Sequence, residues 1–196
     1  MSHSLCHRLA GLAALTLLVA CGGHDDHSGM DMDEEAPAQL VINGNYSDER
    51  FIDMMAAHHQ MAIDMARVEQ QKGNRPELQT IAAGIIEAQQ REIEELKALK
   101  QAHFGSSDVP TRMNHAEMEN AGMMMPEEMG QQPDVDKAFI DSMLPHHAGA
   151  IEMATVALRR SGIAELRTLS RNIIDMQSEE IGQLGEYRKA WYGTQP

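Results

Sequence analysis

The chain contains two copies of one 47-residue segment, separated by 88 positions. Residues 51–97 align with residues 139–185 without a gap, and 20 of the 47 aligned positions are identical. A duplicated segment folds twice into the same local structure, and two copies can bury their apolar faces against each other. The identical positions include the chemically informative residues His58/His146, His59/His147, Met55/Met143, Met65/Met153, Gln89/Gln177 and Glu92/Glu180.

Apolar residues in each copy recur with the spacing of an α-helix, and no alternation typical of a strand is present. Ser47 or Asp48 can cap a first helix, and Pro76 suits the first turn of a second. The predicted helices are 48–72, 76–102, 134–161 and 164–192. Short connections make each pair an antiparallel hairpin. The sequence therefore predicts an all-α fold, a ferritin-like four-helix bundle over 47–193, with repeats 48–102 and 134–192 joined by a long crossover, 103–133.

Residues 1–20 are predicted to be an export signal. Arg8 precedes an apolar segment, residues 9–20, that is too short to span a bilayer. The LVAC sequence at 18–21 resembles a bacterial lipobox, so we expect cleavage before Cys21 and acylation of its thiol; an ordinary secretory signal is the alternative. Cys21 would be the only cysteine left, which excludes an intramolecular disulfide. By resemblance to other lipoproteins, Gly22 implies an outer-membrane anchor in a Gram-negative cell, facing the periplasm or the cell exterior.

Residues 21–46 are polar, acidic and rich in glycine, and are predicted to be a disordered tether. The chain carries a formal net charge of −14, which would repel the phosphates of nucleic acid. Nucleic acid is therefore excluded as a partner. An acidic surface attracts cations instead, although weakly at physiological salt. The expected partners are a metal ion and, through the lipid anchor alone, a membrane.

Both histidines of each pair are predicted to turn toward the interior of the bundle. Phe51 and Met55 define the buried arc of the first helix, and His58 and His59 lie on its two flanks. The third helix repeats this arrangement at the matching positions. Small alanines beside each pair leave room for imidazole rings or for a bound ion.

Glu92 and Glu180 lie at the edges of the buried stripes of the second and fourth helices. A carboxylate at the edge of a core needs a partner, and the histidines of the facing helix lie at a suitable depth. One interpretation is a hydrogen-bonded network that fixes the helix register. The other is a metal site in which the carboxylate is a ligand or supports an imidazole ligand.

The sequence contains 16 methionines and 10 histidines, which are both possible ligands for copper. Met54, His58, Met61 and Met65 form one stripe along the first helix; Met55, Met143 and Met153 are further candidates, with core packing as the alternative. A methionine in a polar loop has no core to fill. We therefore interpret the loop methionines as ligands of shallow Cu(I) sites; the alternative is a compositional bias without function. Imidazole also accepts Cu(II), Zn(II) or Ni(II). The candidates outside the helices are Met113, His115, Met118, Met123, Met124, Met125 and Met129 in the crossover, and His24, His27, Met30 and Met32 in the tether.

The stretches at 58–66 and 146–154, HHQMAIDMA and HHAGAIEMA, and the later QxxEI elements at 89–93 and 177–181, resemble the DUF305 family over about residues 45–192. That family is exported and ferritin-like in fold, and some members resemble periplasmic copper-binding proteins that confer copper resistance. The resemblance therefore implies the same fold and a copper-related function. Many members have a proline before the histidine pair, as Pro145 is here, whereas the first repeat has Ala57.

Together these patterns indicate a lipid-anchored, non-enzymatic copper-binding protein of the cell envelope, a buffer or scavenger with Cu(I) as the favoured ion. One alternative is a ferritin-like redox metalloenzyme, although Glu92 and Glu180 have no histidine three residues on, as the usual di-iron pattern requires. The other is a structural envelope lipoprotein whose histidine pairs only lock the helices together.

Overall fold

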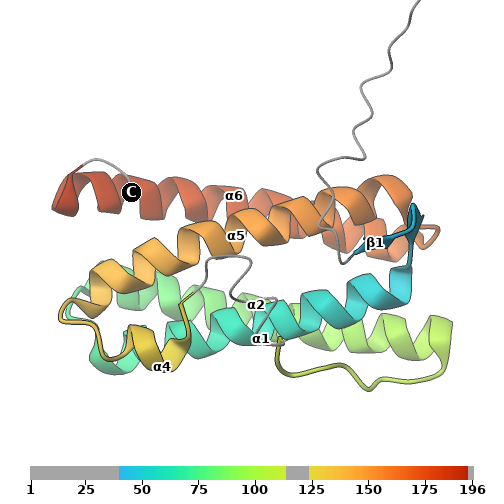
Figure 1. Ribbon diagram of the computed structural model, residues 1–196, viewed down its shortest axis with the longest axis horizontal. Coiled ribbons are helices and arrows are strands. Elements are labelled where there is room, and N and C mark those ends of the chain that lie inside the picture. The colour runs from blue at the N-terminus through green and yellow to red at the C-terminus, as the bar shows by residue number, and fades with distance from the viewer. Residues whose placement is uncertain (1–39, 114–123, 194–196) are drawn as a thin grey trace, which may run out of the picture. The chain divides into compact units, whose positions relative to one another are not determined.

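A computed structural model of the chain describes residues 40–113 and 124–193. The described part is almost entirely helical, which confirms the all-α prediction (Figure 1). Its helices are α1 (Asp48–Lys72), α2 (Pro76–Phe104), α4 (Pro126–Met129), α5 (Val135–Arg160) and α6 (Ala164–Tyr192), and its two strands are β1 (Val41–Ile42) and β2 (Asn45–Tyr46).

Three of the four long helices begin at residues that suit a helix N-terminus. The Ser47 side chain accepts a hydrogen bond from the backbone N–H of Arg50 at 3.3 Å, and the Asp134 side chain accepts one from Lys137 at 2.9 Å. Pro76 occupies the first turn of α2, where a backbone N–H would have no hydrogen-bond partner within the helix, so the lack of an N–H in proline costs nothing. At the other end of α2, Gly105 adopts a φ of 79°, a left-handed conformation that glycine takes without strain.

Strands β1 and β2 correct the expectation that the chain contains no strand. They form an antiparallel hairpin in which Val41 pairs with Tyr46. Asn43 and Gly44 make the turn with φ of 51° and 75°, the conformation that an Asn-Gly pair favours in two-residue hairpins. Leu40 is fully buried against the helices. Residues 40–46, which the sequence analysis placed in the tether, are therefore folded; the rest of the predicted tether and the predicted export signal lie outside the described residues.

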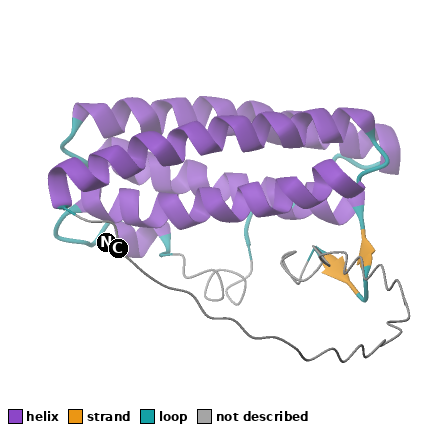
Figure 2. Cartoon of the chain, turned by 90° about the horizontal axis from the view of Figure 1, so that it is seen from above, coloured by secondary structure: helices purple, strands orange, loops and turns teal. Residues whose placement is uncertain are grey.

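Helices α1 and α2 form one antiparallel hairpin, and α5 and α6 form the other. Most contacts between long helices lie within these hairpins, and the main contact between the hairpins joins α1 to α5 (Figures 1 and 2). Contacts between α2 and α6 are much sparser. The start of α1 packs near the end of α5, so the two repeats are related by an approximate two-fold axis across the helices.

The core consists of two apolar clusters. One contains Phe51 and Met55 together with residues from the end of α5, and the other contains Met65 together with Phe139 and Met143. Along each of the four long helices, polar residues lie between the parts that contribute to the two clusters: His58 and His59, Gln89 and Glu92, His146 and His147, Gln177 and Glu180; all are buried except Glu180, which is half-buried. We call these eight residues the polar layer.

One partly buried ion pair occurs in both hairpins. Nζ of Lys100 lies 2.6 Å from Oδ1 of Asp53, and Nε of Arg188 lies 2.5 Å from Oδ1 of Asp141. The two acids and the two bases are each 88 positions apart, so both repeats make the same contact, with Lys in one and Arg in the other. Each pair joins the two helices of its own hairpin.

The two hairpins are also joined by aromatic side chains near the end of α6. The guanidinium of Arg75, at the α1–α2 corner, lies 3.9 Å from the ring centroid of Trp191, a cation–π distance. Trp191 stacks on Tyr187 with centroids 4.4 Å apart. The Tyr192 hydroxyl donates to Asp134 at 3.1 Å. The contact of Arg75 with Trp191 holds the α1–α2 corner against the end of α6.

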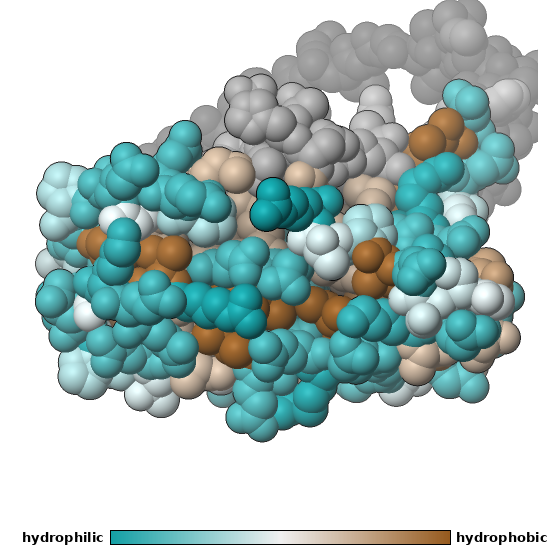
Figure 3. All heavy atoms as spheres, turned by 90° about the horizontal axis from the view of Figure 1, so that it is seen from below, coloured by the Kyte–Doolittle hydropathy of each residue, from teal (hydrophilic) through white to brown (hydrophobic). Residues whose placement is uncertain are grey.

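The face shown in Figure 3 is mainly hydrophilic. Apolar side chains appear there as a broken band between polar ones and as a separate patch at the upper right, and the large apolar residues that are clearly exposed in the described part are Ile42, Phe104 and Met176. None of the helices in the described residues is long and apolar enough to cross a membrane.

Glu69, near the end of α1, is a buried carboxyl group close to another acid. Burial, followed by the nearby Asp136 carboxylate, raises the pKa of Glu69 to about 8. Asp136 already accepts the backbone N–H groups of Asn74 and Arg75, each at 3.0 Å. Neither oxygen of an ionised Glu69 has a donor among the described residues, whereas protonated Glu69 can donate to Asp136. A Cβ at position 73 would overlap Oε1 of Glu69, so only glycine at this position leaves room for the carboxyl group.

The protonation of Glu69 predicts that the protein loses stability as the pH rises. The folded state keeps the proton up to about pH 8, whereas the unfolded chain releases it near 4.5, so unfolding becomes easier across that window. One pKa unit corresponds to about 1.4 kcal/mol, so between pH 4.5 and pH 8 the loss amounts to roughly 5 kcal/mol. Glu69→Gln should match the wild type in free energy of unfolding at pH 5 and exceed it at pH 9, measured by urea denaturation. Equal pH slopes for the two proteins would contradict the assignment.

Candidate metal centre

The polar layer is centred on His58 of α1 and His146 of α5, which meet at the approximate two-fold axis. Their ring centroids are 3.7 Å apart with an interplanar angle of 35°. Nε2 of His146 lies 3.1 Å from the backbone carbonyl oxygen of His58 and is placed to donate to it. His146 is fully buried and His58 nearly so, since α1 and α5 pack closely here.

The second histidine of each pair faces the glutamate of its own hairpin. Nε2 of His59 lies 2.9 Å from Oε2 of Glu92, and Nε2 of His147 lies 2.7 Å from Oε2 of Glu180. Both rings are fully buried. The distances suit hydrogen bonds, but the N–H directions are not aligned with the carboxylate oxygens, so we treat these as close polar contacts. The prediction that each glutamate meets a histidine of the facing helix agrees with this geometry.

Most polar atoms of the layer have no hydrogen-bond partner within the described residues. This holds for Nδ1 of all four histidines and for both amide atoms of Gln89 and Gln177. Buried polar atoms are normally satisfied by protein groups, ordered water or a bound ion, so this set needs water or an ion as its partner. Imidazole nitrogens, carboxylates and amide oxygens are all donors to divalent ions. Within the described residues, however, no three His, Cys, Asp or Glu side chains already lie in an arrangement that would hold a metal ion.

Burial keeps the central histidines neutral. Burial, followed by the neighbouring histidines, holds the pKa of His58 and of His146 well below the usual value for histidine. A neutral imidazole has a lone pair free for a metal, whereas an imidazolium does not. The layer is therefore ready to bind a cation at neutral pH without first releasing protons from these two rings.

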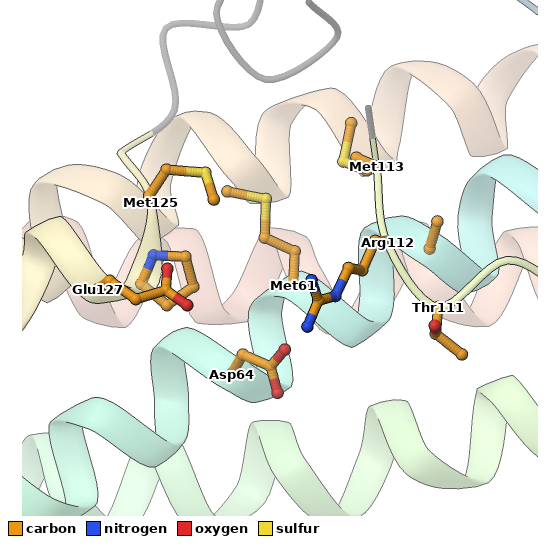
Figure 4. Close-up of a pocket in the computed structure, with 9 residues that line it drawn as sticks. Met61, Asp64, Thr111, Arg112, Met113, Met125 and Glu127 are labelled. Atoms are coloured by element: carbon orange, nitrogen blue, oxygen red, sulfur yellow. The ribbon is translucent and has the colours of Figure 1, made fainter. Parts of the chain in front are cut away.

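A second group of donors lines a cavity on the outer side of α1. Met61 of α1, Met113 of the loop after α2 and Met125 just before α4 border this cavity of about 100 Å³. In Figure 4 the side chains of Met61 and Met125 point toward one another, and Met113 approaches from the loop. Arg112 brings a positive charge, which the carboxylates of Asp64 and Glu127 offset. We call this the thioether pocket.

The remaining predicted residues are distributed between core, loop and undescribed segments. Packing alone accounts for several methionines, because Met55, Met65, Met143 and Met153 lie within the apolar clusters and Met54 packs against one of them. Their role as ligands stays a prediction. Nothing is described for the residues that lie outside the structure's ranges: Cys21, His24, His27, Met30, Met32, His115, Met118 and Met123.

The expectation that crossover methionines have no core to fill is wrong for those that the structure describes. Met129 is fully buried in one apolar cluster, and Met113, Met124 and Met125 pack against the same cluster. The cause is that α4 and the segments beside it fold back against α1 and α5. Asp64, Arg112 and Glu127, which also border the thioether pocket, were not predicted. The crossover has no helical periodicity, so the sequence does not show where it packs.

The chain is similar to a known protein family and to several solved structures. The sequence matches the family described as "Domain of unknown function (DUF305)" over residues 22–100 and 48–188. The chain belongs to the DUF305 family. A crystal structure of a DUF305 fragment from Deinococcus radiodurans is 21% identical, with a TM-score of 0.64 over 71% of this chain and 93% of that one, which shows a shared fold. The search of curated proteins gave no match.

Two further solved structures are more similar in sequence. CopM in the Cu(I)-bound form is 36% identical over 76% of this chain and 100% of that chain, with a TM-score of 0.66. CopM in the Cu(II)-bound form is 37% identical over 76% of this chain and 99% of that chain, with a TM-score of 0.69. This member of DUF305 is thus similar, over most of its length, to a protein solved with copper in both oxidation states.

The buried imidazoles predict that the metal-free protein loses stability in acid. His58 and His146 stay neutral when folded but take up protons near pH 6.5 when unfolded, so stability falls as the pH drops below 6.5. Each pH unit below that value removes up to about 1.4 kcal/mol per histidine. The double variant His58→Gln/His146→Gln should therefore lose less free energy of unfolding between pH 7.5 and pH 5 than the wild type. Identical losses in chelator-treated samples would show that these rings do not control the acid response.

Proposed function

We propose that this DUF305 protein is a copper-binding protein of the cell envelope, a ferritin-like four-helix bundle held at the membrane by a lipid on Cys21. It buffers or scavenges copper and catalyses no reaction. The similarity to CopM, solved with Cu(I), Cu(II) and Ag, supports the choice of metal. The acidic composition supports the attraction of a cation.

The observation that carries the proposal is the thioether pocket. Three methionines from separate segments of the chain border one cavity, and Met61 lies where the second repeat has Gly149, so the duplication alone does not explain its sulfur. Neutral thioethers are soft donors that suit Cu(I), and they need no deprotonation to bind it. They also survive in an oxidising compartment, where cysteine would be lost to disulfides.

The polar layer supplies a second kind of donor. Its imidazoles and carboxylates suit Cu(II), which accepts nitrogen and oxygen. A redox enzyme is a weaker alternative, because the layer lacks the Glu-x-x-His pairs of di-iron bundles. A purely structural layer is the other alternative. It fits the close His–Glu contacts but leaves the amide atoms of Gln89 and Gln177 without partners in the described residues.

Removing sulfur from the thioether pocket should remove Cu(I). The variant Met61→Leu/Met113→Leu/Met125→Leu keeps apolar volume, so we expect each change to cost less than about 1.5 kcal/mol of stability. Under reducing conditions, Cu(I) binding measured by competition with a chromogenic chelator should fall by one equivalent per chain.

The matched control removes three sulfurs from the apolar clusters with Met55→Leu/Met65→Leu/Met143→Leu. This variant should keep the full Cu(I) count, because none of those three residues borders the thioether pocket. If the control loses copper and the pocket variant does not, the ligands lie in the core. If the wild type binds no copper in either oxidation state, the proposed function is wrong.

The lipid anchor is tested separately. Cys21→Ser removes the thiol that lipidation requires, so we expect the precursor to stay uncleaved or the protein to leave the membrane fraction. Cell fractionation with mass spectrometry of the N-terminus measures both. Normal cleavage together with normal membrane association would contradict the anchor and leave the copper proposal standing.

A further inference from the structure

A second cavity lies between α2 and α6, on the far side of the polar layer from the thioether pocket. It has a volume of about 350 Å³ and is bordered by α2 residues that include Ala88, Glu92 and Glu95 and by α6 residues that include Asp175 and Met176. It exists because α2 and α6 make few contacts with each other, whereas α1 and α5 pack closely. We call it the α2–α6 groove.

The groove carries a negative charge. Glu92, Glu95 and Asp175 contribute three carboxylates to its lining. Its one cationic lining residue is Arg91, whose guanidinium lies 2.5 Å from Glu87 outside the groove, so its charge is already offset. Carboxylates around a concave surface concentrate cations from solution.

Glu92 connects the groove to the buried histidines. It borders the cavity, yet it is only 8% exposed. Its Oε2 lies 2.9 Å from Nε2 of His59, a fully buried ring with neither nitrogen hydrogen-bonded in the described part of the chain. Behind the exposed carboxylates, therefore, lies a buried imidazole that is in contact with one lining residue of the groove, Glu92.

The geometry points to the α2–α6 groove as the entry site through which a divalent cation reaches the polar layer, with Glu95 and Asp175 attracting it and Glu92 passing it to His59. The inference rests on the proposed copper function and adds the route and the residues. The expected ion is a divalent cation that accepts oxygen and nitrogen donors. Among the divalent ions of the first transition row, Cu²⁺ binds such donors most strongly.

The entry step is tested by the rate of Cu²⁺ uptake. Glu95→Gln/Asp175→Asn removes two charges from exposed positions and keeps the side-chain shapes. In stopped-flow mixing with glycine-buffered Cu²⁺ at low ionic strength, the association rate should fall by about threefold or more. In 1 M salt, where screening acts within about 3 Å, the difference should vanish. The matched control is Glu77→Gln/Glu165→Gln, which removes two exposed charges at equivalent positions of the two repeats, away from the groove.

The transfer step is tested by Glu92→Gln, with Glu94→Gln on the exposed face of α2 as its control. Glu92→Gln should weaken Cu²⁺ binding by about 10- to 100-fold, the usual effect of losing a ligand's supporting group. It should also reduce the imidazole-nitrogen coupling in the Cu(II) electron paramagnetic resonance spectrum, while the twin contact of His147 with Glu180 stays intact. Thermal melts of the metal-free proteins check that both fold.

Three results overturn the inference. Equal slowing by the groove variant and the Glu77/Glu165 control would mean that only net charge matters. Unchanged affinity and spectrum in Glu92→Gln would mean that Cu²⁺ does not pass this carboxylate, while Cu(I) binding at the thioether pocket, measured separately, could still stand. A wild type that binds no copper at all would overturn the proposed function together with the groove.

Discussion

Four imidazole rings buried in the middle of the helices are the constraint on which the rest of the structure depends. His58 and His146 stack at 3.7 Å on the approximate two-fold axis, and each neighbouring histidine faces a glutamate from its own hairpin. A charged ring at this depth would be costly, so burial keeps the central pair neutral. The apolar core is consequently divided into two clusters, each of which must be closed at its outer end by other contacts. The repeated Asp–Lys and Asp–Arg pairs, the β1–β2 hairpin and the aromatic group around Trp191 provide them.

Duplication explains why the layer is symmetric, and the departures from symmetry show where the two halves differ. Met61 of the first repeat borders the thioether pocket, whereas the matching position of the second repeat is Gly149, which has no side chain to offer. Glu69 has Ala157 as its counterpart, so only one hairpin has a buried acid at that position. The shared residues therefore form the layer at the axis, whereas the unshared ones add a thioether pocket on one side and a protonated carboxyl group at one end.

Much of the fold could be predicted because it depends on periodicity and on helix-end signals. The four helices, the capping Ser47, the inward turn of both histidines and the meeting of Glu92 with a histidine all follow from spacing along a regular helix. The stacking of His58 on His146 could not be predicted, because it depends on how the hairpins dock. The thioether pocket and the burial of Met129 depend on the path of an irregular crossover, which has no repeating pattern. The partners of Asp53 and Asp141 were also missed, although both acids and both bases recur at the offset of 88 residues.

The position of Trp191 has a practical consequence. It is the only tryptophan in the chain, and its ring lies under the guanidinium of Arg75 at the α1–α2 corner and beside Tyr187 of its own helix. Intrinsic fluorescence excited at the indole band therefore reports the environment of one junction between the hairpins, whereas far-ultraviolet circular dichroism reports all the helices together. A difference between the two signals during unfolding would reveal hairpins that separate before they melt, without any label being added to the protein.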